Sequence, residues 1–358
     1  MPQCYRWHRG RGNIWGCQIT KNLCKIRHCC LLNIPKTQLC YKRYKYVFTL
    51  GVLITIQFLF LVKIRANYIE LYSIVNSSIP DTFWHEYYEM RKVSVRHVSS
   101  FSLKNDFVIV TACGRDIAPA LPIFRSNLYS ILRLFKDYRI FLGESDSVDT
   151  TLINFQQWRN EDSKVYVYTY GNLTATYSRN RAHRIAFCRN NLLQVIRGNN
   201  WIRKAKFLLV MDIDINANAI LTVDNFLTNF KYDIRDWAAM TASQTKLYYD
   251  VWAVRTHALN YDCWNIVDPL KHQEIARKIY VYVHAKPIPR ELGLIPVRSA
   301  FGGFGVYQTV YLNNCYYKAF DETIRQTCEH ISFHDCIVNN GGKIFINSEF
   351  QNADGLTN

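Results

Sequence analysis

The chain has 358 residues, and its 44 Lys and Arg against 28 Asp and Glu give a formal net charge of +16. The first 45 residues carry ten of the basic side chains and no acidic one. Because this surplus lies beside an apolar run and no nucleic-acid motif accompanies it, it indicates contact with anionic lipid headgroups and excludes nucleic acid as the expected partner.

Residues 46–62 form an uncharged run, YVFTLGVLITIQFLFLV, which is followed by Lys63. A run of this length lies at the short end of what spans a bilayer, and flanking Tyr and Lys side chains extend its reach. We therefore expect a transmembrane anchor over 46–63 rather than a buried core helix. The positive-inside rule then leaves residues 1–45 as a cytosolic tail. A cleaved signal peptide fits less well, since the basic region is too long and no A-x-A-like site follows the run.

The twelve cysteines divide evenly between the two sides of this anchor. In the tail no C-x-x-C pair marks a zinc site, and Cys40 is close enough to the membrane for palmitoylation, with a plain thiol as the simpler alternative. The other six face an oxidising compartment and allow up to three disulfides, whose pairing stays open. They are Cys113, Cys188, Cys263, Cys315, Cys328 and Cys336. Asn76 and Asn172 each begin an N-glycosylation sequon.

Residues 64–105 mix polar, aromatic and charged side chains without a sustained period, which is typical of a stem. From Asp106 onward, short β-branched runs alternate with amphipathic stretches at 117–136 and 179–197. The runs expected as strands are 107–112, 138–143, 164–170, 206–212, 237–242, 250–255, 304–309 and 343–347. This order predicts an α/β fold with a mostly parallel sheet, and the length supports a single domain over 106–358.

Chemistry-bearing residues follow three of the expected strands. These residues are Cys113-Gly114-Arg115-Asp116, Glu144-Ser145-Asp146-Ser147 and Asp212-Ile213-Asp214. Ligands gather at the carboxyl ends of parallel strands, so these groups are expected at one edge of the sheet. Alternate side chains of an extended segment share a face, so Asp212 and Asp214 point the same way. Two carboxylates suit Mn²⁺ or Mg²⁺ bound to a diphosphate, although a cap of the next turn is the simpler interpretation.

The order of these features resembles the GT-A glycosyltransferases, whose nucleotide-sugar-binding half begins with a β-strand and ends in a D-x-D; here that interval runs from Phe107 to Asp212. Tail, anchor, stem and body in this order also resemble Golgi transferases. Within the fold, the chain is similar to the fungal capsule-associated α-1,3-mannosyltransferase type over roughly residues 106–350. The likeness rests on Glu144-Ser-Asp-Ser with Asp149-Thr-Thr, RAHRIAFCRN (181–190), the Asp pair, YYDVWAVR (248–255), FGGFGVY (301–307) and CEH (328–330).

The resemblance implies a GT-A enzyme that moves a hexose, with mannose favoured, from a nucleotide sugar to a hydroxyl of a glycan or glycoconjugate. It also implies a single-pass type II membrane protein that faces the lumen of the Golgi or endoplasmic reticulum. A homo-oligomeric state stays open. So do the acceptor and the stereochemistry of transfer.

Glycosyl transfer needs the charge of a departing nucleoside diphosphate to be neutralised. A Mn²⁺ or Mg²⁺ on Asp212 and Asp214 is expected to do so, and guanidinium groups are suited to grip the phosphate oxygens. The residues expected at the nucleotide sugar are Thr111, Cys113, Gly114, Arg115, Glu144, Asp146, Arg181 and Arg189. The simpler alternatives are surface cations for the arginines and turn or helix caps for the acids.

Acceptor-binding residues are expected from the second half of the chain. Asp250 and Trp252 set a carboxylate, a candidate catalytic group, beside an aromatic ring, a pair suited to a sugar; a core strand explains the aromatic residue equally well. Gly302 and Gly303 indicate a backbone that approaches a ligand closely, or a simple tight turn.

The segment 328–336 concentrates titratable groups between two cysteines. Glu329 or Asp335 is expected as a general base that deprotonates the acceptor hydroxyl, and His330 or His334, with His334 favoured, as a further metal ligand. A structural loop edged by a disulfide is the alternative.

Three other functions are alternatives to glycosyl transfer. Aspartyl phosphatases also carry D-x-D after a strand, but that strand comes early and Thr or Val follows, whereas here the strand is the fourth and Asn216 follows. No G-x-x-x-x-G-K-S/T loop is present, which argues against a nucleotide hydrolase. A membrane-anchored carbohydrate-binding or adhesion protein with a non-catalytic transferase fold is the non-enzymatic alternative, and the intact Asp pair speaks against it.

Overall fold

The computed structural model describes residues 38–257, 259–267 and 273–355. The chain divides into two compact units, Met1–Glu70 and Leu71–Asn358. In the described part of the chain, the segment Thr49–Ser73 of helix α2 (Gln38–Ser78) is long and apolar enough to cross a membrane, with a mean hydropathy of 1.7 and none of it buried. This is compatible with the anchor predicted over 46–63. The predicted tail lies mostly outside the described residues.

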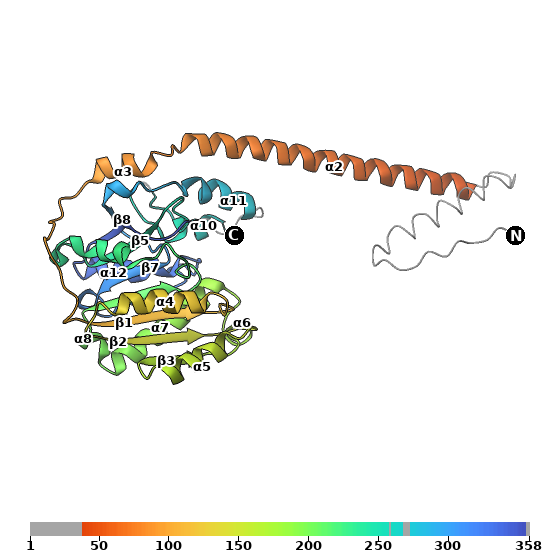
Figure 1. The fold of residues 1–358 in the computed structure, drawn as a ribbon. Helices are drawn as coiled ribbons and strands as arrows, with labels where there is room; N and C mark the ends of the chain where they lie inside the picture. The colour runs from red at the N-terminus through yellow and green to blue at the C-terminus, as the bar shows by residue number, and fades with distance from the viewer. Residues whose placement is uncertain (1–37, 258, 268–272, 356–358) are drawn as a thin grey trace. The chain divides into compact units, whose positions relative to one another are not determined.

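The segment expected as a stem is largely ordered structure. Helix α2 continues to Ser78 and helix α3 (Phe83–Arg91) follows it (Figure 1). Trp84 and Tyr87 of α3 are buried in the core, and the Tyr87 hydroxyl donates to the Pro296 carbonyl at 2.8 Å. Residues from Leu71 onward therefore belong to the globular unit. No periodic pattern in the sequence indicates this, because α3 buries aromatic residues without a clear amphipathic period.

Eight strands form one mixed sheet in the order β3-β2-β1-β4-β7-β5-β8-β6. They are β1 Phe107–Gly114, β2 Asp137–Glu144, β3 Val165–Thr169, β4 Phe207–Asp212, β5 Ala239–Gln244, β6 Leu294–Val297, β7 Phe304–Gln308 and β8 Ile344–Ala353. The pairs β3–β2, β2–β1, β1–β4 and β5–β8 are parallel. Strand β7 runs antiparallel to both of its neighbours, β4 and β5, and β6 is antiparallel to β8. The α/β class and the mostly parallel sheet are confirmed, and the antiparallel strands β6 and β7 make the sheet mixed.

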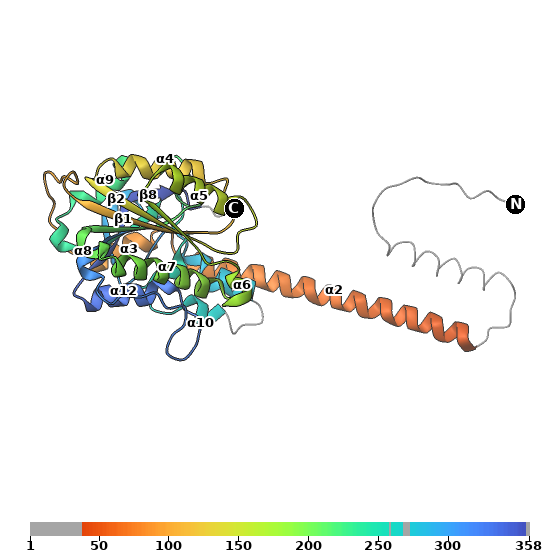
Figure 2. The same cartoon turned by 90° about the horizontal axis from the view of Figure 1, so that it is seen from below.

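Helices cover both faces of this sheet (Figures 1 and 2). They are α4 Leu121–Leu132, α5 Thr151–Glu161, α6 Leu173–Thr176, α7 Arg181–Gly198, α8 Trp201–Lys204, α9 Val223–Leu227, α10 Cys263–Val267, α11 Gln273–Tyr280 and α12 Glu329–Asn339. Along β1, Val108 and Val110 join the core cluster beneath α4, α5 and α9, while Ile109 joins the cluster beneath α7 and α12. A strand buried on both faces explains why the sequence shows a continuous apolar run there.

One predicted strand is wrong. Residues 250–255 contain the short 3-10 helix η3 (Val251–Ala253) instead, and only Arg255 forms an isolated bridge, to Ser299. The Ala253 N–H donates to the Asp250 carbonyl, so the segment closes a local turn rather than a ladder. The remaining 3-10 helices are η1 Thr228–Lys231, η2 Ile234–Asp236, η4 Tyr282–His284, η5 Arg290–Leu292 and η6 Thr309–Tyr311.

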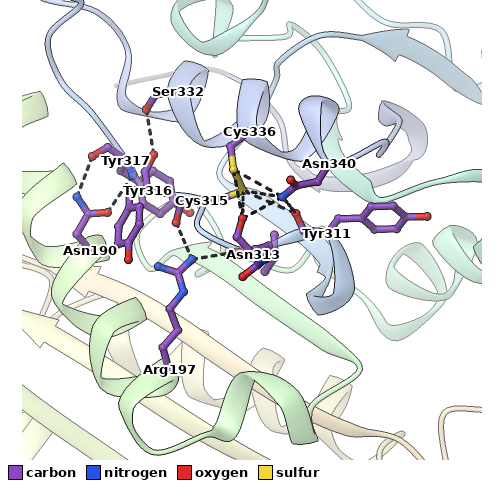
Figure 3. Close-up of a disulfide and its surroundings, with 11 residues drawn as sticks. Asn190, Arg197, Tyr311, Asn313, Cys315, Tyr316, Tyr317, Ser332, Cys336 and Asn340 are labelled. Atoms are coloured by element: carbon purple, nitrogen blue, oxygen red, sulfur yellow. Dashed lines mark hydrogen bonds between the residues drawn. A yellow bond between two sulfur atoms is a disulfide. The ribbon is translucent and has the colours of Figure 1, made fainter.

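Two disulfides form among the six cysteines that follow the anchor. Cys113–Cys188 ties the end of β1 to α7, and Cys315–Cys336 ties the loop after η6 to α12. Around the second, Arg197 of α7 donates to the Cys315 carbonyl at 2.6 Å, so this loop is held from two helices (Figure 3). Cys263 and Cys328 are buried thiols. The disulfides are compatible with the predicted oxidising compartment.

A buried turn at Gly302 and Gly303 precedes β7. Both residues have positive φ, +65° and +81°. A Cβ atom on Gly302 would lie 2.3 Å from the Ala242 carbonyl oxygen, and one on Gly303 would lie 2.7 Å from a methyl of Ile215. Only glycine fits both the conformation and the space, so this turn brings β7 tightly against the end of β4.

Asn216 holds that turn, and its removal is expected to destabilise the fold. Its fully buried amide donates to the carbonyls of Asp212 and Gly303, both at 2.7 Å, and accepts from Asn352 at 3.0 Å. Asn216→Ala leaves these buried groups unpaired and is expected to cost about 2–3 kcal/mol of unfolding free energy. Thermal unfolding of the full chain in detergent measures this. Asn154→Ala, which removes a single 3.5 Å bond to Thr150, is the control, and an equal loss in both variants would contradict the assignment.

Candidate active site

A cavity of about 200 Å³ lies at the carboxyl ends of β1, β2 and β4, and we call it the smaller cavity. Its wall includes the Cys113–Cys188 disulfide and the backbone of Gly114 and Gly143. The residues with charged side chains that line it are Arg115, Arg181, Arg184, Arg189, Asp212 and Asp214. The structure thus places most of the predicted donor-side groups in one small space.

Asp212 and Asp214 reach this cavity from the end of β4. The strand stops at Asp212, and the chain continues as a turn in which Ile213 is buried and Asp214 is exposed. Asp214 accepts from the N–H of Ile215 at 2.9 Å. Both carboxylates therefore line the same cavity while the isoleucine between them fills the core.

Arg189 of α7 is buried and contacts two carboxylates and one histidine. Its terminal nitrogens donate to Glu329 at 2.5 Å and to Asp212 at 3.0 Å, and one lies 2.6 Å from the His330 ring. Its guanidinium also lies 5.0 Å from the centre of the Phe301 ring. The expectation that Arg189 grips a diphosphate needs correction, because its terminal nitrogens already bind protein side chains.

A second cavity of about 820 Å³, the larger cavity, shares Arg181 and Arg189 with the smaller one. Asp250, Trp252 and Glu329, which the sequence predicts on the acceptor side, all line this cavity. The Trp252 ring packs against a second tryptophan, Trp264 of α10, with ring centres 4.2 Å apart and planes 31° apart. This pair forms an aromatic surface in the cavity wall.

The glycine turn connects the two cavities through the backbone. The Gly302 N–H donates to the Asp250 carboxylate at 3.0 Å, and the Asp212 N–H donates to the Gly303 carbonyl at 2.9 Å. Two adjacent glycines therefore fix an acid of the larger cavity relative to an acid of the smaller one. Gly302 and Gly303 are buried and line neither cavity, so their expected contact with a ligand is replaced by this positioning role.

The turn connects Asp212 and Asp250, and the pKa values of both carboxyl groups are raised. Burial raises the pKa of Asp250 to about 7; the hydrogen bond from Gly302 opposes this rise, and the negative charges of Asp212 and Glu329 add to it. Burial likewise raises the pKa of Asp212 to about 6, with Arg189 opposing and Asp214 adding to the rise. A carboxylate with a pKa near 7 is suited to exchange protons at neutral pH.

Three other predicted residues lie outside both cavities. His334 is fully buried, and its ring nitrogens lie 2.8 Å from the Ser299 hydroxyl and 2.9 Å from the Tyr307 hydroxyl, which leaves no ring nitrogen for a metal. Asp335 forms a two-pronged ion pair with Arg298, at 2.6 and 2.9 Å. Thr111 is buried within β1.

Glu144, at the end of β2, and Asp146, in the loop that follows, form hydrogen bonds with neighbouring loop and strand residues. Glu144 is buried and accepts from the Ser147 N–H and the Thr169 hydroxyl. Asp146 accepts from the Thr174 N–H at 2.7 Å and lies 3.8 Å from Arg184. Neither lines a cavity, so the alternative interpretation as turn caps holds for both.

Several lining residues were not foreseen. Arg184 lies three positions after Arg181 on α7, so helical spacing alone places both on one face. Ser145 and Tyr249 also line the cavities; they belong to the quoted segments 144–147 and 248–255 but were not singled out. Trp264, Arg277 and Lys286 line the larger cavity and carried no local signal. Trp264 and Arg277 belong to a short helical pair, α10 and α11, that the periodicity did not reveal.

Asp212 and Asp214 fit a hard divalent cation whose remaining coordination positions are filled by a bound ligand and water. Among the described residues, no group of three or more His, Cys, Asp or Glu is arranged to hold a metal. Asp212 and Asp214 supply two carboxylates with like charges close enough to raise the pKa of Asp212. Magnesium-type sites are commonly built from one or two carboxylates plus phosphate oxygens and water, so these residues fit such an ion.

Comparisons with known proteins reach only distant likenesses. No protein-family model matches the chain, and no curated protein sequence matches it. Among solved structures, a mannosyltransferase from Pyrobaculum calidifontis in complex with GDP-Man and Mn²⁺ aligns with a TM-score of 0.43 and 11% identity, over 81% of this chain and 68% of that one. The S. aureus TarS 1-349 complex with UDP-GlcNAc aligns at 0.39 and 12%, over 68% and 56%.

The mannosyl-3-phosphoglycerate synthase from Rubrobacter xylanophilus aligns with a TM-score of 0.32 and 10% identity, over 67% of this chain and 61% of that one. The chain thus spans between 56% and 68% of the length of these three proteins. Similarities this distant carry no argument about the reaction.

Proposed function

We propose that the protein is a metal-dependent glycosyltransferase that moves a hexose from a nucleotide sugar to a hydroxyl of a glycan or glycoconjugate. The observation that carries this proposal is the junction of the two cavities. On one side are two carboxylates and four arginines, and on the other is Asp250, a carboxylate with a pKa near 7, beside a tryptophan pair. A donor and an acceptor meet at such a junction.

The smaller cavity suits the donor. Arg181 presents its guanidinium group to a diphosphate, and it makes no ion pair with any residue in the described ranges. Arg115 and Arg184 also line this cavity, but they are paired with Asp116 and Asp146. Asp212 and Asp214 would hold Mn²⁺ or Mg²⁺, which when bound supplies positive charge to the departing diphosphate. Arg189 fixes the orientation of Asp212 through the 3.0 Å bond.

The larger cavity suits the acceptor. A sugar ring stacks its C–H face on the Trp252 and Trp264 surface, and its hydroxyl approaches Asp250. The Asp250 carboxylate takes the proton of that hydroxyl while the oxygen bonds to the anomeric carbon and the bond to the diphosphate breaks. Glu329 is less suited to this role because it is already paired with Arg189.

The finer assignments rest on the sequence resemblance. Mannose is the favoured hexose for that reason alone. A single-pass type II position in the secretory pathway is supported by the apolar stretch of α2 and by the two disulfides. The oligomeric state stays open.

A carbohydrate-binding protein without catalysis is the second candidate. The tryptophan pair alone would serve such a protein. The raised pKa of Asp250 favours catalysis, because keeping a carboxyl in a site that opposes its ionisation has no use in sugar binding.

A thermal-shift screen of the full chain in detergent tests the proposal. UDP- and GDP-sugars are added with Mn²⁺ or with EDTA. One class of donor is expected to raise the midpoint only with Mn²⁺, by several degrees at a hundredfold excess over its Kd, where binding adds about 2.7 kcal/mol. Release of free hexose from that donor is then measured. Equal shifts in EDTA, or no shift with any donor, would contradict the proposal.

A further inference from the structure

The larger cavity is lined by a cation that forms no ion pair with another described residue. This cation is Arg277 of α11, whose side chain is half-buried and whose Nε atom is buried without a hydrogen-bond partner among the described residues. Helix α11 packs against α10, which carries Trp264 of the aromatic pair. An unpartnered guanidinium nitrogen therefore lies in the same cavity wall as the surface proposed for the acceptor sugar.

The other buried cations in this cavity are neutralised. Arg189 pairs with Glu329 and Asp212, and Lys286 donates to Asp81 at 3.1 Å. The Arg277 side chain has no such pair in the described ranges. A buried polar group left unpaired costs free energy, so a ligand that satisfies this guanidinium binds with a gain.

We propose that this cavity takes an acceptor that carries an anionic phosphate group next to a sugar or polyol ring. The ring lies on the surface of Trp252 and Trp264, and the phosphate accepts from Arg277, since a guanidinium matches phosphate geometry. This assignment deepens the proposed function and rests on it for the identity of the acceptor, but the binding itself is testable without turnover.

Such a phosphate has two sources, a membrane lipid headgroup and a soluble sugar phosphate. Tyr72 and Asn76 also line the cavity, and Tyr72 belongs to Thr49–Ser73, the segment that is long and apolar enough to cross a membrane. A membrane lipid is therefore one of the two sources to test. The experiment has an arm for each source.

Binding of two soluble probes to the full chain in detergent tests the proposal by tryptophan fluorescence or calorimetry. The soluble probes are glycerophosphoinositol and neutral myo-inositol. The phosphate-bearing probe is expected to bind at least about tenfold more tightly, as one charge-assisted hydrogen bond predicts. Arg277→Gln is expected to abolish this preference and leave myo-inositol binding unchanged. Lys278→Gln on the same helix, whose side chain pairs with Glu274 and does not line the cavity, is the control.

The membrane arm uses the same protein in phosphatidylcholine nanodiscs with or without phosphatidylinositol. Competition by the lipid against glycerophosphoinositol supports the proposal with a membrane acceptor, and tight soluble binding without competition supports it with a soluble one. Equal affinity for the charged and neutral probes, or an unchanged preference in Arg277→Gln, would overturn it. Mn²⁺-dependent hydrolysis of a nucleotide sugar is followed in parallel. Hydrolysis without a preference for the phosphate-bearing probe would contradict this inference alone. Absence of hydrolysis would contradict the proposed transferase activity.

Discussion

Asp214→Ala is expected to lower hexose transfer at least about 100-fold, the size of effect seen when a group that stabilises transition-state charge is removed. Asp214 lines the smaller cavity and is exposed, and among the described residues its carboxylate accepts only from the N–H of Ile215, so its loss removes the proposed metal ligand and little else. Transfer from the donor identified by thermal shift, measured across a Mn²⁺ titration, checks this. The Mn²⁺ concentration needed for donor binding is expected to rise in the same variant.

Asp335→Asn is the matched control for this experiment. It removes another carboxylate that the sequence made a candidate, but one that the structure places in a surface ion pair with Arg298. Activity close to that of the unmodified protein is expected, because a surface ion pair contributes about 0–1 kcal/mol. An Asp214→Ala protein that folds normally and keeps full Mn²⁺-dependent transfer would remove the metal site.

Asp250→Asn is expected to lower transfer by about 100- to 10,000-fold, the range for loss of a general base. With Asp250 present, kcat/KM is expected to rise as pH increases through about 7, because the carboxylate must be deprotonated to accept the hydroxyl proton. The amide cannot titrate, so this rise should disappear in the variant. Mn²⁺-dependent donor binding should remain, since Asp250 lines only the larger cavity.

Glu329→Gln distinguishes Glu329 from Asp250, the two candidate bases that line the larger cavity. Glu329 binds Arg189 at 2.5 Å, so its replacement weakens a buried pair and is expected to lower stability. The rise of kcat/KM near pH 7 should persist in this variant. If the rise vanished in Glu329→Gln and survived in Asp250→Asn, the base would be Glu329.

The same pKa shift has a consequence for stability. Because the folded-state pKa of Asp250 is raised above its ordinary value of 3.8, its protonated form favours folding at low pH, and that contribution is lost as pH rises through about 7. Asp250→Asn is therefore expected to stabilise the protein at pH 8, by on the order of 2 kcal/mol, and to leave it unchanged at pH 4. Thermal unfolding at both pH values measures this, and a destabilised variant at pH 8 would contradict the shift.

The sequence by itself determined the fold class and one half of the site. Buried strands must be apolar on both faces, so β1, β2 and β4 were visible as continuous runs, and the polar residues that follow them had to meet at one sheet edge. Asp212 and Asp214, which line the smaller cavity, were predicted as metal ligands in this way. Arg184 was within reach of the same reasoning, since it lies one helical turn from Arg181.

Only the tertiary structure decided which of the remaining predicted side chains face a cavity and can contact a ligand. Glu329 and Asp335 are six positions apart on α12, so they leave the helix on different sides, and only one faces a cavity. Asp250 gains its raised pKa from enclosure by segments distant in the chain, including the turn at Gly302. Burial and charge pairing arise from contacts between residues far apart in sequence, and local pattern does not encode them.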